Sequence, residues 1–225
     1  MSVRQMMMGR KPVAGGGVDW RDYLYDYWIV DDAVSSTDLA SANGLLPDLP
    51  VDVVDSDGFY LTAGQSFTTG ISSIHGVVAV VSSLGLGPGQ NNPIADVAYS
   101  GGWVINVRWG FGTSPPSWPY SISSGSTRAG VGKHPDRELD AGETGVMASG
   151  RDAGDARTFI LPDDSGTEEW TGTGFNTGVS HLSVGVSSLR EFGSTNLRYK
   201  MVGFLTGRPE RDVIDALWAE YGVSL

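Results

Sequence analysis

The feature that most restricts the fold is a strict alternation of apolar and other residues between positions 103 and 111. The apolar positions are Trp103, Ile105, Val107, Trp109 and Phe111. Successive side chains of a β-strand point to opposite faces of its sheet, so this period of two predicts a strand with one buried face. A sheet with such a face must bury it against a second layer.

Short apolar runs separated by turn residues continue this pattern along the chain. The run Val77-Val78-Ala79-Val80-Val81 suits a strand that is covered on both faces. Glycine and proline, 32 and 11 of the 225 residues, are scattered between the runs, as they are where many strands are joined by turns. We therefore expect an all-β sandwich, with further strands at 59–63, 67–71, 76–84, 146–149, 157–161, 181–189 and 197–205.

The period changes near the C-terminus. Pro209 suits the first position of a helix, and Val213, Leu217 and Tyr221 recur every four residues. Gly222 is a natural stop. The sequence predicts one short α-helix that packs its apolar stripe onto the sandwich.

Composition excludes several classes of function. The chain has no cysteine, which removes disulfides, zinc–thiolate sites and a thiol nucleophile. Its formal net charge of −11 argues against nucleic acid as a partner, because phosphate binding depends on lysine and arginine. No stretch approaches the length of a membrane-spanning helix, about 20 apolar residues. Residues 1–18 lack the apolar run of a secretory signal.

The sequence divides into a flexible basic arm at 1–17, an aromatic-rich lead-in segment at 18–50, and the sandwich with its helix at 51–225. The arm has neither a helix nor a strand period. We expect the arm and the lead-in segment to dock the domain onto a partner, although a disordered start and a core role for the aromatic residues are open alternatives. The expected docking residues are Arg4, Met6, Met7, Met8, Arg10, Trp20, Tyr23 and Trp28.

The C-terminal part of the chain carries a resemblance to a known family. Residues 197–209 read Leu-Arg-Tyr-Lys-Met-Val-Gly-Phe-Leu-Thr-Gly-Arg-Pro and lead into the helix that ends near Tyr221. Residues 146–159 look like two strands joined by a polar turn. Over about residues 55–222 the chain resembles concanavalin A-like, laminin-G-like jelly-roll domains. The resemblance implies an antiparallel jelly-roll β-sandwich with a short C-terminal helix, a fold shared by lectins, glucanases and structural modules.

A basic, glycine-hinged arm before such a domain is similar to bacteriophage virion proteins of tail fibres, head fibres or capsid-associated positions. This resemblance implies a structural component located in the virion. Its partners would be other virion proteins, further copies of itself as a homo-oligomer, and host surface glycans. On this interpretation we expect that the chain is not an enzyme.

An acidic triplet supplies the alternative function, a glycoside hydrolase. Glu138, Asp140 and Glu143 fit the Glu-x-Asp-x-x-Glu spacing of jelly-roll glucanases similar to laminarinases. Retaining hydrolysis needs two carboxyl groups roughly 5–5.5 Å apart, which alternate strand positions can supply. Here the small residues Ala141 and Gly142 replace the bulky apolar residues of that family, so a solvated acidic turn is the favoured interpretation.

The best candidate for a binding loop lies at 112–130. Trp118 and Tyr120 lie among prolines that stiffen the loop, which gives a flat apolar surface suited to a sugar ring or a neighbouring protein. The alternative is that Trp118 folds back and caps the sandwich.

Metal ligands are scattered along the chain. Acidic loops at 31–32, 55–58 and 163–169 hold the oxygen ligands that calcium prefers, but none has the spacing of a complete calcium loop. The three histidines, His75, His134 and His181, are far apart in the sequence. We therefore expect no metal and no other cofactor, with calcium as the open alternative.

Overall fold

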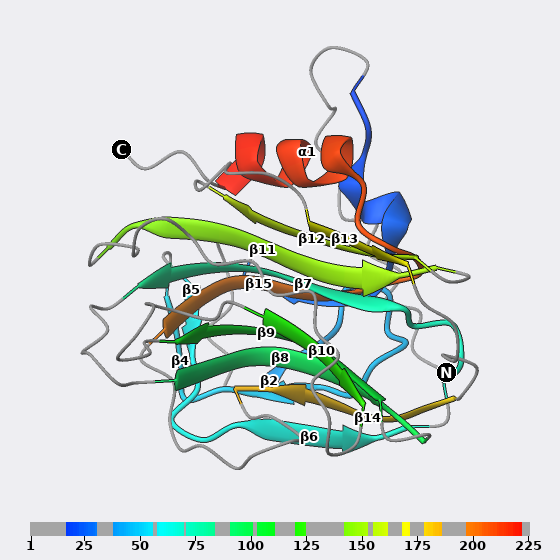
Figure 1. Cartoon of the computed structure of the whole chain (residues 1–225). Helices are drawn as coiled ribbons and strands as arrows, with labels where there is room; N and C mark the ends of the chain where they lie inside the picture. Colours follow the sequence, from blue (N-terminus) through cyan, green and yellow to red (C-terminus); the bar gives the residue numbers. More distant parts are fainter. Residues whose placement is uncertain are drawn as a thin grey trace.

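A computed structural model shows two antiparallel β-sheets stacked as a sandwich, with one α-helix on the outside of the larger sheet (Figure 1). The expected fold class is confirmed: the strands of both sheets pair antiparallel and a short helix closes the chain. The structure describes residues 17–30, 38–55, 58–69, 71–83, 91–100, 103–110, 120–124, 142–152, 155–161, 168–171, 178–185 and 197–221.

The larger sheet has eight strands in the order β13-β12-β11-β7-β15-β5-β4, and β1 pairs with β15 beside this path. Its strands are β1 (Leu24–Ile29), β4 (Val53–Asp55), β5 (Gly58–Tyr60), β7 (Gly76–Ser83), β11 (Thr144–Arg151), β12 (Asp155–Leu161), β13 (Glu168–Thr171) and β15 (Leu197–Leu205). The smaller sheet has five strands in the order β10-β9-β8-β14-β6. These are β6 (Gln65–Thr68), β8 (Asn91–Tyr99), β9 (Trp103–Gly110), β10 (Tyr120–Ser124) and β14 (Val179–Val184).

Four further elements complete the described chain. The 3-10 helix η1 (Trp20–Tyr23) precedes β1, β2 (Asp38–Leu39) pairs with β3 (Leu49–Pro50), and α1 (Arg211–Tyr221) follows β15. In the part of the chain that the structure describes, no helix has the length and apolar character needed to cross a membrane.

The main core fills the space between the two sheets. Val77, Ala79 and Val81 from β7 face Val97 and other apolar residues of the smaller sheet, and all are closed to solvent. The rings of Phe59 and Tyr199 stack within this core at a centroid distance of 5.2 Å. The apolar run at 77–81 is a central strand, as predicted.

A second apolar cluster lies on the other face of the larger sheet, under α1. Val78 and Val80 of β7 contact this cluster, which explains why the whole run 77–81 is apolar. Val213, Ile214 and Leu217 of α1 are buried against it. The prediction of a helix that packs onto the sandwich is confirmed, although α1 begins at Arg211, two residues after Pro209.

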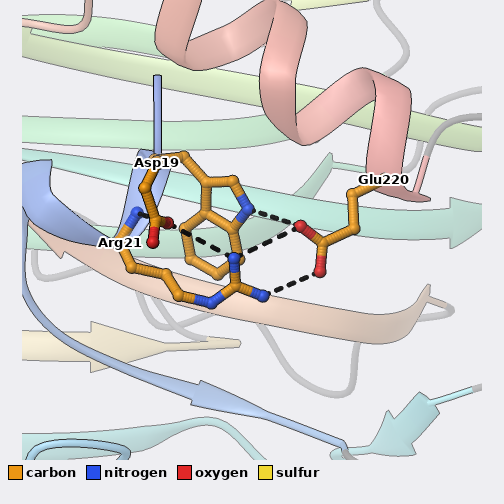
Figure 2. Close-up of polar contacts among 4 residues, drawn as sticks. Asp19, Arg21 and Glu220 are labelled. Atoms are coloured by element: carbon orange, nitrogen blue, oxygen red, sulfur yellow. Dashed lines mark hydrogen bonds and ion pairs between the residues drawn. The ribbon is translucent and has the colours of Figure 1, made fainter. Parts of the chain in front are cut away.

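The start of the described chain is tied to the end of α1, as Figure 2 shows. The indole N–H of Trp20 donates to Oε2 of Glu220 at 2.8 Å, and Nη2 of Arg21 donates to Oε1 of Glu220 at 2.8 Å. Burial raises the pKa of Glu220, but the hydrogen bonds from Trp20 and Arg21 outweigh burial and leave the pKa below its usual value. These contacts fix the lead-in segment onto the helix.

Two of the aromatic residues predicted to dock a partner lie inside this chain. Trp20 and Trp28 are only 1% and 0% exposed, because η1 packs against α1 and β1 joins the larger sheet beside β15. Their side chains are therefore not presented to a partner in this fold. Tyr23 is 38% exposed. The other expected docking residues, Arg4, Met6, Met7, Met8 and Arg10, lie outside the described residues.

Candidate functional site

The outer faces of the two sheets carry different kinds of side chain. The outer face of the larger sheet is apolar and is covered by α1 and Trp20. The outer face of the smaller sheet carries both apolar and polar side chains. In Figure 1, β14 and β6 of this sheet lie at the bottom, on the opposite side from α1.

A polar row crosses the smaller sheet. Asp96 of β8 pairs with Ser183 of β14, which in turn pairs with Ser66 of the edge strand β6. The residues that flank Asp96 and Ser183 along each strand, such as Val97 and Leu182, belong to the core, so these two polar side chains point to the outer face. Ser183 Oγ lies 3.4 Å from Ser66 Oγ and donates a hydrogen bond to it.

Asp96 is the most unusual residue of this row, because its carboxyl group is completely closed to solvent. Ser183 beside it is only 1% exposed. Burial of an ionised carboxylate is costly unless other groups compensate it, so the surroundings of Asp96 must provide that compensation.

Three exposed side chains lie next to the buried pair. Ser66 and Thr68 point outward from β6, and His181 points outward from β14 opposite Thr68. We call Ser66, Thr68 and His181 the polar strip. Neighbouring strands are about 4.8 Å apart, a spacing at which side chains on two strands can contact one small ligand. The strip offers two hydroxyl groups and an imidazole, each of which can form hydrogen bonds.

A chain of hydrogen bonds orients the His181 ring. Ser180 Oγ donates to the backbone oxygen of Ala98 at 3.1 Å, and His181 Nδ1 lies 3.1 Å from Ser180 Oγ. Ser180 occupies an irregularity in the pairing of β14 with β8, which allows two consecutive residues to make these contacts.

A second cluster of polar side chains consists of His75, Tyr99 and Arg151, of which Tyr99 belongs to the main core. The guanidinium carbon of Arg151 lies 4.9 Å from the ring centroid of Tyr99, and the Tyr99 hydroxyl donates to the backbone oxygen of Ile74 at 3.2 Å. Burial raises the pKa of Tyr99 to about 12. Burial lowers the pKa of His75, and the positive charge of Arg151 lowers it further. Tyr99 and Arg151 are buried and His75 is half-buried, so we assign this group a role in stability.

The lowered pKa of His75 predicts that the folded protein loses stability at acid pH. The pKa of His75 in the folded chain lies below its usual value of 6.5, so the unfolded chain binds a proton first as the pH falls. The contribution of a neutral His75 to stability is present above about pH 6.5 and is lost as the pH falls toward the folded pKa.

Urea unfolding at about pH 7.5 and about pH 5.5 measures this effect. We expect wild type to lose more unfolding free energy between the two pH values than the His75→Gln variant, which cannot titrate. An equal loss in both proteins would contradict this assignment.

The structure tests little of the predicted ligand loop and acidic triplet. Trp118, Glu138 and Asp140 lie outside the described residues. Tyr120 is the first residue of β10, so the loop that holds Trp118 joins β9 to β10 in the smaller sheet. Glu143 is half-buried and lies one residue before β11, after Gly142 with φ 86°. Glu143 thus lies between a turn and a strand, and the role of the acidic triplet stays a prediction.

The described residues place few of the expected calcium ligands. Asp55 ends β4 and Gly58 begins β5, and these two residues pair across the predicted turn. Among the described residues, no group of three or more His, Asp or Glu side chains is placed to hold a metal ion. The acidic residues at 31–32 and 163–164 lie outside the described residues. Calcium binding therefore stays an open alternative of the sequence analysis.

Solved structures share the fold of this chain, although its sequence matches no known family. Neither a family model nor a curated protein matches the sequence. Trypanosoma rangeli sialidase in complex with 2,3-difluoro-KDN matches with a TM-score of 0.58 and 12% identity, over 88% of this chain and 32% of the sialidase chain. The same sialidase in complex with sialic acid matches with a TM-score of 0.56 and 13% identity, over 88% of this chain and 33% of that chain.

This chain therefore spans about one third of the length of the sialidase, and at such identities the likeness concerns the fold alone. The match contradicts the expectation that the chain is not an enzyme. That expectation treated the domain as a structural or adhesion module, whereas solved structures that match most of this chain are those of a sialidase.

Sequence reasoning missed the residues of the polar row. Asp96 stands in the apolar run Ile94-Ala95-Asp96-Val97-Ala98, and a single acid within such a run is a signal that could have identified it. The sequence gives no comparable signal for Ser66 and His181, because only the pairing of β6 with β14 brings them together.

Proposed function

We propose that the domain binds glycans on the outer face of the smaller sheet, at the polar strip. The observation that carries this proposal is the row in which a fully buried carboxyl group, Asp96, lies next to exposed side chains that form hydrogen bonds. Sugars present many hydroxyl groups in a small space, and the strip offers donors and acceptors on two adjacent strands.

The fold supports the same conclusion. The sialidase that shares this fold has been solved in complex with sialic acid, so glycan contact is in keeping with the match over most of this chain. The loop that holds Trp118 and leads to Tyr120 joins two strands of the same sheet, and we propose these two aromatic residues as further sugar contacts.

Binding to immobilised neutral and sialylated oligosaccharides, followed by titration calorimetry, tests the proposal. We expect the triple variant Ser66→Ala, Thr68→Val, His181→Ala to lose at least about tenfold in affinity, since each neutral hydrogen bond contributes about 0.5–1.5 kcal/mol. The control is Asp215→Ala, an exposed position on α1. Equal binding by wild type, the triple variant and the control would contradict the proposed site.

The finer interpretation from the sequence remains a proposal. The matched sialidase structures give no support for a place in a bacteriophage particle. From the sequence we propose docking through the arm at 1–17, a homo-oligomer, other virion proteins as partners and location in the virion. The experiment that addresses them is co-purification of the full chain with assembled particles.

A further inference from the structure

The orientation of His181 points to the chemical class of the glycan. Resting on the glycan-binding function proposed above, we infer that Nε2 of His181 accepts a hydrogen bond from an uncharged sugar hydroxyl group. We infer also that the site disfavours sugars that present a carboxylate.

The first step fixes the tautomer of the ring. A backbone carbonyl oxygen can only accept, so the single hydroxyl proton of Ser180 is used in the bond to Ala98. Ser180 Oγ must then accept from His181, and Nδ1 of the neutral ring carries the proton. The neutral imidazole has one proton, so Nε2 holds a lone pair. The exposed ring of His181 therefore offers an acceptor to a ligand.

The second step concerns charge around the strip. The strands β6, β8 and β14 contain no lysine or arginine, and Asp96 of β8 lies in the row next to His181. The whole chain carries a formal net charge of −11. A carboxylate-bearing sugar would meet a lone pair at Nε2 and an overall negative field, whereas a hydroxyl donor meets a matching acceptor.

Calorimetric titration with lactose and 3′-sialyllactose tests the inference, because the second sugar differs only by an added carboxylate-bearing residue. We expect wild type to bind lactose at least about fivefold more tightly than 3′-sialyllactose at neutral pH. The His181→Gln variant, whose amide oxygen can accept a hydrogen bond, should retain lactose binding.

The outcomes separate the inference from the function on which it rests. Tighter binding of 3′-sialyllactose than of lactose by wild type, or loss of lactose binding in His181→Gln, would overturn the inference and leave glycan binding standing. If wild type binds neither sugar nor any oligosaccharide of the immobilised set, the proposed function itself fails, and the inference with it.

Discussion

Replacing Asp26 with alanine should lower the free energy of unfolding by about 3–5 kcal/mol, because hydrogen bonds to a charged group contribute about 1.5–3 kcal/mol each and are not fully additive. The Asp26 carboxyl group is completely buried. Its Oδ1 accepts from the backbone N–H groups of Tyr27 and Asn43, and its Oδ2 accepts from those of Leu45 and Leu46, at 2.8–2.9 Å. Without it, these donors lose their common acceptor.

Urea unfolding of purified protein measures this effect. Asp48→Ala is the matched control, since Asp48 is an exposed acid near the same turn and its loss should change stability by less than about 0.5 kcal/mol. Asp26→Asn should fall between the two, because the amide keeps one acceptor oxygen. A loss below about 1 kcal/mol for Asp26→Ala would mean that the 43–46 turn does not depend on this carboxylate.

Replacing Trp28 with alanine should cost a similar amount, about 3–5 kcal/mol, as expected for the loss of a large buried aromatic side chain. The Trp28 ring lies between Phe67 and Phe204, at centroid distances of 5.8 and 5.9 Å. Its indole N–H donates to the backbone oxygen of Pro47 at 3.1 Å. The side chain thus joins β1, β6, β15 and the lead-in segment in one core.

Thermal and urea unfolding measure this effect. The control is Tyr23→Ala, because Tyr23 is an aromatic residue of the same segment that is 38% exposed. We expect Tyr23→Ala to cost less than about 1 kcal/mol. If both changes had equally small effects, the lead-in segment would stand apart from the core, as the docking hypothesis assumed. A large loss for Trp28→Ala alone supports the observed packing.

Local periodicity predicted the strands whose pattern is complete within a few residues. The alternation from Trp103 became β9, the apolar run at 77–81 became β7, and the stripe through Leu217 became α1. The strand β8 was not predicted, because it opens with Asn91-Asn92-Pro93 and contains Asp96, all of them residues that are uncommon in strands. A register shift between Pro93 and Ala95 accommodates the proline.

Pairing between strands that are far apart in the sequence determines those elements that the local residue pattern did not predict. The aromatic segment around Trp28 has both helical and strand spacings, and it becomes a strand because it pairs with β15 near the other end of the chain. The same holds for the candidate site. His181, Ser66 and Asp96 are far apart in sequence, and only the order β8-β14-β6 places them on one face. The sequence favoured the aromatic loop of Trp118, which stands out without any knowledge of pairing.

The most direct test of glycan binding at the polar strip is a map of backbone amide chemical shifts during titration with lactose. We expect the largest shifts on β6, β14 and the middle of β8, at residues 66–68, 180–183 and 96–98, while the amides of α1 stay unchanged. Shifts confined to α1 and the larger sheet, or no shift at saturating sugar, would contradict it.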